Sequence, residues 1–245
     1  MSNILDRYGI KEVADVVFYT INSDGTPGTP VLILDTLKVS TIEQTAESTS
    51  ARGGKGNPEL ISWDYGKEIT VTLEDALFSA KSMALMYGVD VDDNNAFGEE
   101  EYILKTVKPK NVEVDEASSS AWFIINGEKV AVNSWECFSD KGELLASDSS
   151  IPEGTVYVTG HIKVNGQKIS ISADSFPGTY YLVGDTYARS AKTGQDEFFQ
   201  FIIPKAKMQS EVTLTMEAEG DPSTFNMSMK VLRPANGQMM KLVKC

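Results

Sequence analysis

Alternation of apolar and polar residues with a period of two runs through most of this chain, and it restricts the fold more than any other feature. The side chains of a strand point alternately to its two faces, so this pattern predicts strands with one buried face. Between Val31 and Val39 both faces carry apolar residues, which predicts a strand that is covered on both sides. The pattern therefore predicts a mainly β fold, a sandwich or barrel.

Two Asn-Gly pairs, Asn126-Gly127 and Asn165-Gly166, stand between alternating segments. Asn-Gly suits a two-residue hairpin turn, because both of its residues need a positive φ. The expected cross-strand partners are Ile125 with Glu128, Phe123 with Val130, Ala121 with Val132, Val164 with Gln167, and Ile162 with Ile169. A third hairpin is expected where residues 212–218 and 225–231 alternate on either side of Glu219-Gly220-Asp221-Pro222.

One segment has the spacing of a helix. Apolar residues recur at intervals of three and four, which predicts an amphipathic helix over residues 73–87 that flanks the sheet. The residues with this spacing are Leu73, Leu77, Ala80, Ala84 and Tyr87. Thr72 followed by Asp75 resembles a capping box, and Gly88 stands where a left-handed cap would end the helix.

The remaining segments are predicted to be loops. Ser40–Pro58 is polar with glycines at its tip, and Asp90–Glu101 is strongly acidic. Structureless loops longer than about 12–15 residues are usually functional or disordered. Since the composition shifts nowhere, we expect one domain over residues 1–245. Residues 89–160 are a candidate inserted or elaborated β segment, with Ala117–Ser120 as a candidate entry.

The charge excludes several function classes. The 22 Lys and Arg residues against 35 Asp and Glu residues leave a net charge of −13, so the chain lacks the basic surface that nucleic acid needs. With only Cys137 and Cys245, a disulfide framework is excluded. No apolar run approaches the ~20 residues of a membrane span, and the first residues lack the apolar core of a secretion signal. We expect a soluble protein without a membrane anchor, made in a cytoplasm.

A search for catalytic chemistry finds no site. His161 is the only histidine, and we expect it to be an ordinary strand residue. Residues 90–94 (DVDDN) begin like a calcium loop, but Asn95 stands where the glycine is required. Residues 52–58 lack the spacing of a phosphate-binding loop. We therefore predict no catalytic residues, no metal ligands, no cofactor and no enzymatic activity.

Two stretches carry a family resemblance. Residues 57–78 read NPELISWDYGKEITVTLEDALF, and residues 198–234 read FFQFIIPKAKMQSEVTLTMEAEGDPSTFNMSMKVLRP. Both resemble the major tail proteins, or tail tube proteins, of tailed bacteriophages. The resemblance implies a β-sandwich or barrel with one helix, and hexameric rings that stack into the tube through which DNA is ejected. It places the protein in the virion, assembled in the host cytoplasm.

The resemblance also implies partners. These are other copies of the chain and other tail proteins, namely sheath, tape measure, baseplate or terminator proteins. Genomic DNA would pass through the tube without specific binding, since carboxylates repel phosphate.

In this family a long loop or hairpin before the helix reaches the neighbouring ring, and the matching stretch is Ser40–Pro58. Part of it, from Gln44 to Asn57, would be disordered in a free subunit and would become ordered on stacking. The candidate inter-ring contacts are Gln44, Arg52, Gly53, Gly54, Lys55, Gly56 and Asn57. Arg52 and Lys55 could pair with carboxylates of the ring below.

Two alternatives remain open from the residues. The first is another phage structural part of related fold, such as a baseplate or tail-completion ring or a capsid decoration protein. The second is a carbohydrate-binding β-sandwich that stacks sugars on Trp63, Trp122 or Trp135. For Trp63 we expect a place in the core or a turn instead.

Overall fold

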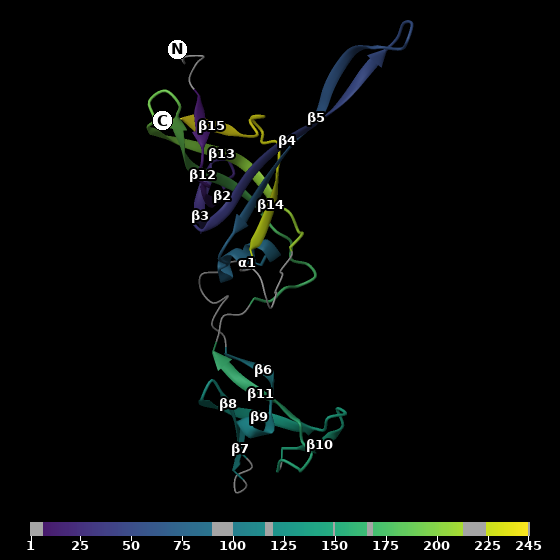
Figure 1. Cartoon of the computed structure of the whole chain (residues 1–245), viewed down its shortest axis with the longest axis vertical. Helices are drawn as coiled ribbons and strands as arrows, with labels where there is room; N and C mark the ends of the chain where they lie inside the picture. The colour runs from purple at the N-terminus through teal and green to yellow at the C-terminus, as the bar shows by residue number, and fades with distance from the viewer. Residues whose placement is uncertain are drawn as a thin grey trace. The chain divides into compact units, whose positions relative to one another are not determined.

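The structure is a computed structural model, and it describes residues 7–89, 100–115, 120–148, 150–165, 169–212 and 224–244. The chain forms two compact units (Figure 1). Unit 1 comprises Met1–Val91 and Ile169–Cys245, and unit 2 comprises Asp92–Lys168. Both are built from antiparallel sheet, and α1 is the single α-helix among the described residues. The predicted fold, mainly β with one helix, is confirmed.

Nine strands of unit 1 form one antiparallel sheet among the described residues. Its order is β3-β2-β12-β13-β14-β5-β4. In addition, β1 pairs with residues 188–190 of β12, and β15 pairs with residues 199–202 of β13. The elements of unit 1 are β1 (Tyr8–Ile10), β2 (Asp15–Ile21), β3 (Pro27–Leu34), β4 (Leu37–Arg52), β5 (Glu59–Asp75), α1 (Ala80–Tyr87), β12 (Thr179–Ser190), β13 (Asp196–Met208), β14 (Phe225–Val231) and β15 (Lys241–Lys244).

The sheet of unit 1 curves around one hydrophobic core. Strands from both ends of the order contribute to it, and so do two residues of α1. The core side chains include Val16, Phe18, Leu34, Val71, Leu73, Leu85, Met86, Leu182, Ile203, Met227 and Met229. On β5 and β14 these residues alternate with polar ones, so the period-two pattern does mark the buried face here.

The helix is shorter than predicted, and its first part is strand. Leu73 pairs with Met227 on the adjacent strand, so the expected start of the helix is the end of β5. The capping box is formed by Ser79 and Ser82, not by Thr72 and Asp75. Asp75 is instead buried and accepts hydrogen bonds from the Thr36 hydroxyl at 2.6 Å and the Leu77 N–H at 3.2 Å. Apolar spacing was misleading because alternation and helical spacing overlap over so few residues.

The end of the helix is as predicted. Gly88 is the C-cap with φ +70°, and its N–H donates to the carbonyl groups of Ala84 and Leu85. A Cβ at this position would lie 2.1 Å from the carbonyl carbon of Phe176, so the glycine also lets the chain before β12 cross closely.

The strand with two apolar faces is covered on only one. On β3, Leu32 and Leu34 are buried in the core while Ile33 is 62% exposed. Leu32 and Leu34 pack into the core of unit 1, and no described element of the chain covers the opposite face of β3 at Ile33.

Unit 2 is a six-stranded sheet with its own small core. Its order is β6-β11-β9-β8-β7, with β10 paired to β9. The elements are β6 (Glu100–Val107), a 3₁₀ turn (Pro109–Asn111), β7 (Val112–Asp115), β8 (Ser120–Ile125), β9 (Glu128–Phe138), β10 (Leu144–Ser147) and β11 (Tyr157–Asn165). The core comprises Ala121, Phe123, Trp135, Cys137, Val158 and Ile162.

One predicted Asn-Gly hairpin is confirmed and the other is wrong. Asn126 and Gly127 have φ +53° and +88°, and β8 pairs with β9 in the predicted register. The partners of Ile162, however, are Ile103 on β6 and Val132 on β9, and Ile169 lies outside any strand. Since Ile162 is paired on both of its edges, it has no edge left for Ile169. Residues 166–168, which follow Asn165 in the expected turn, lie outside the described residues.

The third predicted hairpin is only partly described. Its returning strand is β14, which pairs with β5 and β13. Residues 213–223 lie outside the described residues, as do residues 90–99 of the acidic segment and residues 116–119.

Candidate functional site

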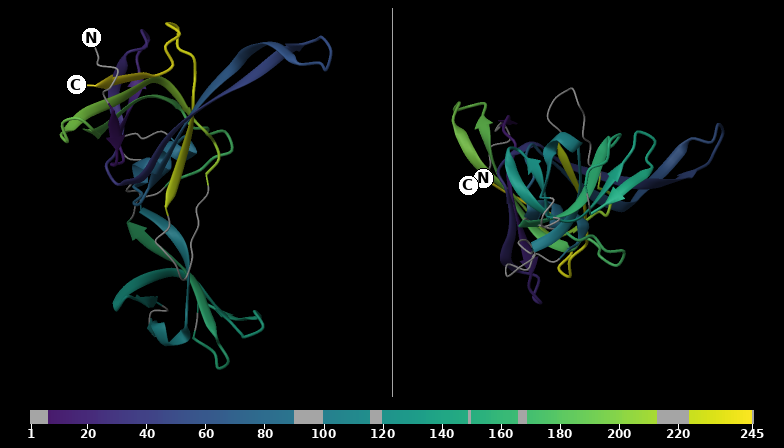
Figure 2. Two further views of the ribbon diagram at one scale, coloured as in Figure 1. Left: turned by 45° about the horizontal axis from the view of Figure 1, so that its top comes forward. Right: turned by 90° about the horizontal axis from the view of Figure 1, so that it is seen from below.

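The expected loop at Ser40–Pro58 is not a loop but most of a long hairpin. β4 and β5 pair all the way from Leu37 opposite Asp75 out to Arg52 opposite Glu59. Beyond the core, residues 59–68 on β5 are all exposed, as are residues 43–49 on β4. We call residues 43–68 the arm. Figures 1 and 2 show it running out from the sheet of unit 1. Its strands were missed because without a core they show no burial pattern.

Six of the seven predicted contact residues come together at the tip of the arm. The Gly53 N–H donates to the carbonyl of Pro58, and the Asn57 N–H donates to that of Gly54, both at 3.2 Å. Gly54, Gly56 and Asn57 have positive φ of 84°, 86° and 51°, which glycine and asparagine adopt most readily. These residues therefore form the turn of the hairpin.

The charged and amide side chains of that prediction have different environments. Arg52 forms an ion pair with Glu59 at 3.2 Å, so its charge is used within the arm. Lys55 is exposed at the tip. Gln44 pairs with Ile69 at the other end of the arm, eight residues from Arg52, or about 26 Å along a strand. The structure thus separates Gln44 from the tip group.

The arm carries an apolar row that the sequence prediction missed. Ile61, Trp63 and Tyr65 alternate along β5 and are 55%, 52% and 53% exposed. Alternate residues share a face of a strand, so these three side chains form one row. The expectation that Trp63 lies in the core or in a turn is therefore wrong. The available signal was the alternation of Ile61, Trp63 and Tyr65 with Ser62 and Asp64.

A bulge separates the row from the core-facing part of β5. Thr45 pairs with Glu68, but Glu47 pairs with Tyr65, so two residues, Gly66 and Lys67, stand opposite one. Gly66 has φ +62°, as expected for a bulge that begins with a left-handed glycine.

The extra residue changes the face on which odd-numbered residues lie. Residues directly opposite in an antiparallel pair share a face, so Tyr65 lies on the face of Glu47 and Thr45. The buried side chains of Ile69 and Val71 lie on the other face. The row of Ile61, Trp63 and Tyr65 thus belongs to the outer face of the hairpin, turned away from the side that covers the core of unit 1.

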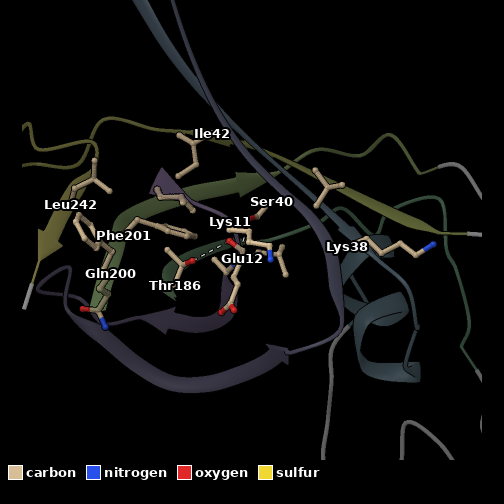
Figure 3. A pocket seen from close by; sticks show the side chains of 14 residues that line it. Lys11, Glu12, Lys38, Ser40, Ile42, Thr186, Gln200, Phe201 and Leu242 are labelled. Carbon is tan, nitrogen blue, oxygen red and sulfur yellow. Dashed lines mark hydrogen bonds between the residues drawn. The ribbon is translucent and has the colours of Figure 1, made fainter. Parts of the chain in front are cut away.

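Unit 1 also contains an open apolar cleft of about 410 Å³. It lies where the base of β4 approaches β1, the segment before β2, β13 and β15. Figure 3 shows Phe201, Gln200 and Leu242 at one end of it and Lys38 at the other. The apolar lining is Ile10, Val13, Ala14, Val39, Ile42, Phe199, Phe201 and Leu242. Lys11, Glu12 and Lys38 also lie along it.

Polar contacts hold the walls of the cleft in place. The Thr186 hydroxyl donates to the carbonyl of Glu12 at 3.1 Å, which ties the segment before β2 to β12 (Figure 3). On β15, Lys244 bonds to Glu197 at 2.5 Å and contacts the hydroxyl and ring face of Tyr8. These partners raise the pKa of Lys244, first through Glu197 and then through Tyr8. The strand that carries Leu242 is thus fixed to both β13 and β1.

The other candidate residues show no site. His161 pairs with Leu104, and its Nδ1 lies 3.1 Å from the Ser134 hydroxyl on β9, as expected of a strand histidine. Trp135 is 2% exposed in the core of unit 2, and Trp122 is half-buried. Residues 90–95, which begin like a calcium loop but lack its glycine, lie outside the described residues.

Metal and membrane sites were sought over the same described ranges. No group of three or more His, Cys, Asp or Glu residues is arranged to hold a metal ion. Nor does any described helix have the length and apolar character to span a membrane.

Comparison with known proteins bears on the whole chain. No curated protein matches it. A family model described as the YomU/Tube protein family matches residues 8–244, which includes both units and the arm. The match supports the resemblance to phage tail tube proteins, and the chain belongs to the YomU/Tube protein family.

Proposed function

We propose that this chain is a non-enzymatic subunit that self-assembles into stacked, hexameric rings and so forms the tail tube of a phage virion. The observation that carries the proposal is the arm. It extends a two-stranded sheet well past the core and exposes Ile61, Trp63 and Tyr65 together. An isolated two-stranded hairpin is at best marginally stable in water, so an arm of this kind is expected to gain a partner.

Free strand edges support self-association in the same way. β3 and β4 stand at the two ends of the sheet order, and each pairs on one side only among the described residues. Monomeric proteins usually blunt such edges with short strands, charges or bulges, because free edges invite pairing with other chains. In a closed ring each edge can pair with a neighbouring copy, and none is left over.

The charge of the chain fits a conduit for DNA. With a net charge of −13, a channel lined by this protein repels phosphate, so that DNA passes through without binding. The tube would join the other tail proteins that the resemblance implies, such as the tape measure and the terminator or baseplate proteins.

The test is negative-stain electron microscopy of the purified, concentrated protein, with light scattering on the same sample. Hollow rods built from stacked rings are the expected result. Closed rings that never stack would instead point to a baseplate or tail-completion part. A protein that stays monomeric, also when mixed with a tail initiator complex, would overturn the proposal and favour a decoration or sugar-binding protein.

A further inference from the structure

We infer that the row of Ile61, Trp63 and Tyr65 on one copy docks into the apolar cleft of unit 1 on a second copy. This rests on the proposed self-assembly and names the two surfaces that meet. Both surfaces are apolar, and the described residues leave each of them open. The cleft volume of about 410 Å³ lies within the range of roughly 300–1,000 Å³ that is usual for binding pockets.

Distance excludes the chain's own arm as the occupant of its cleft. Ile42, which lines the cleft, pairs with Val71 on β5. Trp63 is eight residues further along the same strand, or about 26 Å away. The row also lies on the outer face of the hairpin, whereas Ile42 belongs to the core-facing side. A cleft that its own row cannot reach is open to the row of another copy.

The chemistry of the two surfaces is complementary. Trp and Tyr are the residues most enriched among those that dominate binding energy at interfaces, and they act when they fill a desolvated pocket. The floor of the cleft includes the rings of Phe199 and Phe201. Glu47 lies opposite Tyr65 on the face of the row, while two bases and one acid, Lys11, Lys38 and Glu12, lie along the cleft and give its lining a net positive charge. Docking would thus bring an acid toward a base at the edge of an aromatic contact.

The contact propagates because its two halves are different surfaces. After one row fills one cleft, the first copy still offers its cleft and the second copy its row. Such head-to-tail contacts give rings when the rotation closes and open-ended assemblies when it does not. One contact of this kind therefore suits a polymer of identical subunits.

The test uses variants that remove one surface each. Trp63→Ser empties the row, and Leu242→Asp places a charge in the cleft at a position that is 67% exposed, so that neither change removes a core side chain. Leu60→Ser is the control, since Leu60 is a 63% exposed apolar residue of the arm that does not belong to the row. Val39→Asp, on the other wall of the cleft, repeats the cleft change should Leu242→Asp disturb β15.

Trp63→Ser and either cleft variant should each raise the critical concentration for assembly about 30-fold, as loss of a dominant interface residue does. Leu60→Ser should assemble as the wild type does. The decisive experiment mixes Trp63→Ser with a cleft variant. The first retains its cleft and the second its row, so we expect the two variants to join one to one, as dimers of subunits or of rings, by sedimentation, and to form no rods.

The outcomes separate this inference from the proposed function. If wild-type rods form and both single variants assemble at the wild-type concentration, the inference is overturned and the tube remains. If the single variants fail but their mixture yields no dimers, the row and the cleft do not contact each other, and the inference is again overturned. If the wild type never assembles, both proposals fall.

Discussion

Substituting Gly184 by alanine should destabilise unit 1 through a single crowded contact. Gly184 lies in β12 between two strands, paired with Val16 on β2 and with Phe201 on β13. A Cβ built on it would lie 1.9 Å from Cζ of the Phe201 ring, and the next two nearest atoms also belong to that ring. The ring therefore lies across the glycine and must move if a methyl group is added.

The size of the effect follows from two opposing contributions. Phe201 belongs to the core of unit 1 and also lines the cleft, so moving its ring disturbs packed neighbours. Overpacking of this kind costs about 1–3 kcal/mol. Alanine in the interior of a strand is in turn favoured over glycine by about 0.5–1 kcal/mol. At mid-range, about 2 kcal/mol of overpacking less about 0.75 kcal/mol leaves a loss of roughly 1–1.5 kcal/mol.

Urea unfolding followed by circular dichroism measures this loss. For a urea dependence of about 2 kcal/mol per M, the midpoint should fall by roughly 0.5–0.75 M. Tryptophan fluorescence reports mainly on the unfolding of unit 2, because Trp135 is buried there while Trp63 of unit 1 is already exposed in the folded protein. It therefore serves as a reference that the change in unit 1 should not affect. The fluorescence transition should change little.

The control is Gly9→Ala. Gly9 lies in β1, its Cβ would meet nothing within 4 Å, and its backbone does not require positive φ. This change should alter the stability by less than about 0.5 kcal/mol. Adding Phe201→Leu to Gly184→Ala should recover part of the loss, because a smaller side chain frees the space above residue 184. A Gly184→Ala variant as stable as the wild type would refute the crowding argument.

Two further predictions concern the helix and the buried thiol. Ser79→Ala should cost about 1 kcal/mol in urea unfolding, because the Ser79 Oγ accepts a hydrogen bond from the Ser82 N–H at 3.0 Å, whereas Ser79→Asp should keep the cap. Burial raises the pKa of the Cys137 thiol, against a smaller opposing effect of the hydrogen bond with Thr155. A smaller fraction of the thiol is therefore ionised at pH 8 in the folded protein. In a Cys245→Ser variant, where Cys137 is the remaining cysteine, we expect the folded protein to react with a disulfide reagent at least about tenfold more slowly than the unfolded protein.

The sequence predicted strands well wherever one face meets a core. Around Asn126-Gly127 alternation continued on both sides of a strong turn signal, and the register was correct to the residue. Around Asn165-Gly166 the same local signal was misleading, because β6 and β9 already occupy the edges of β11. Which edge of a strand is free depends on distant segments, and no local pattern contains that information.

The contact surface was predicted only in outline. The family resemblance pointed to Ser40–Pro58 as the contact stretch, and this stays a prediction. The strands within it were missed because both faces are polar or exposed, so composition there resembles that of a loop. Conversely, Trp63 was expected in the core or a turn, whereas it is exposed: Ile61, Trp63 and Tyr65 have the same odd numbering as the buried Ile69 and Val71, and sequence alone does not reveal the bulge that places them on the other face.

Gly66 begins the bulge that moves odd-numbered residues of β5 to the other face, and the last prediction concerns this residue. A bulge bends its strand and increases the twist, so Gly66 and Lys67 set the direction in which the arm leaves unit 1. Gly66→Asn should preserve assembly, since asparagine tolerates positive φ and a Cβ there meets nothing closer than 3.9 Å. Gly66→Val should impair assembly, because a β-branched residue does not adopt φ +62° without strain.

Deletion of Gly66 tests the direction of the arm separately from the face on which the row of Ile61, Trp63 and Tyr65 lies. With one residue fewer, Thr45 can still pair with Glu68 and Glu47 with Tyr65, so the row stays on the outer face while the bend is lost. If the bend matters, the deletion variant should fold with wild-type stability yet require a higher concentration to form rods, as Gly66→Val does. Normal assembly of the deletion variant would mean that the face of the row suffices and that the direction set by the bulge does not contribute.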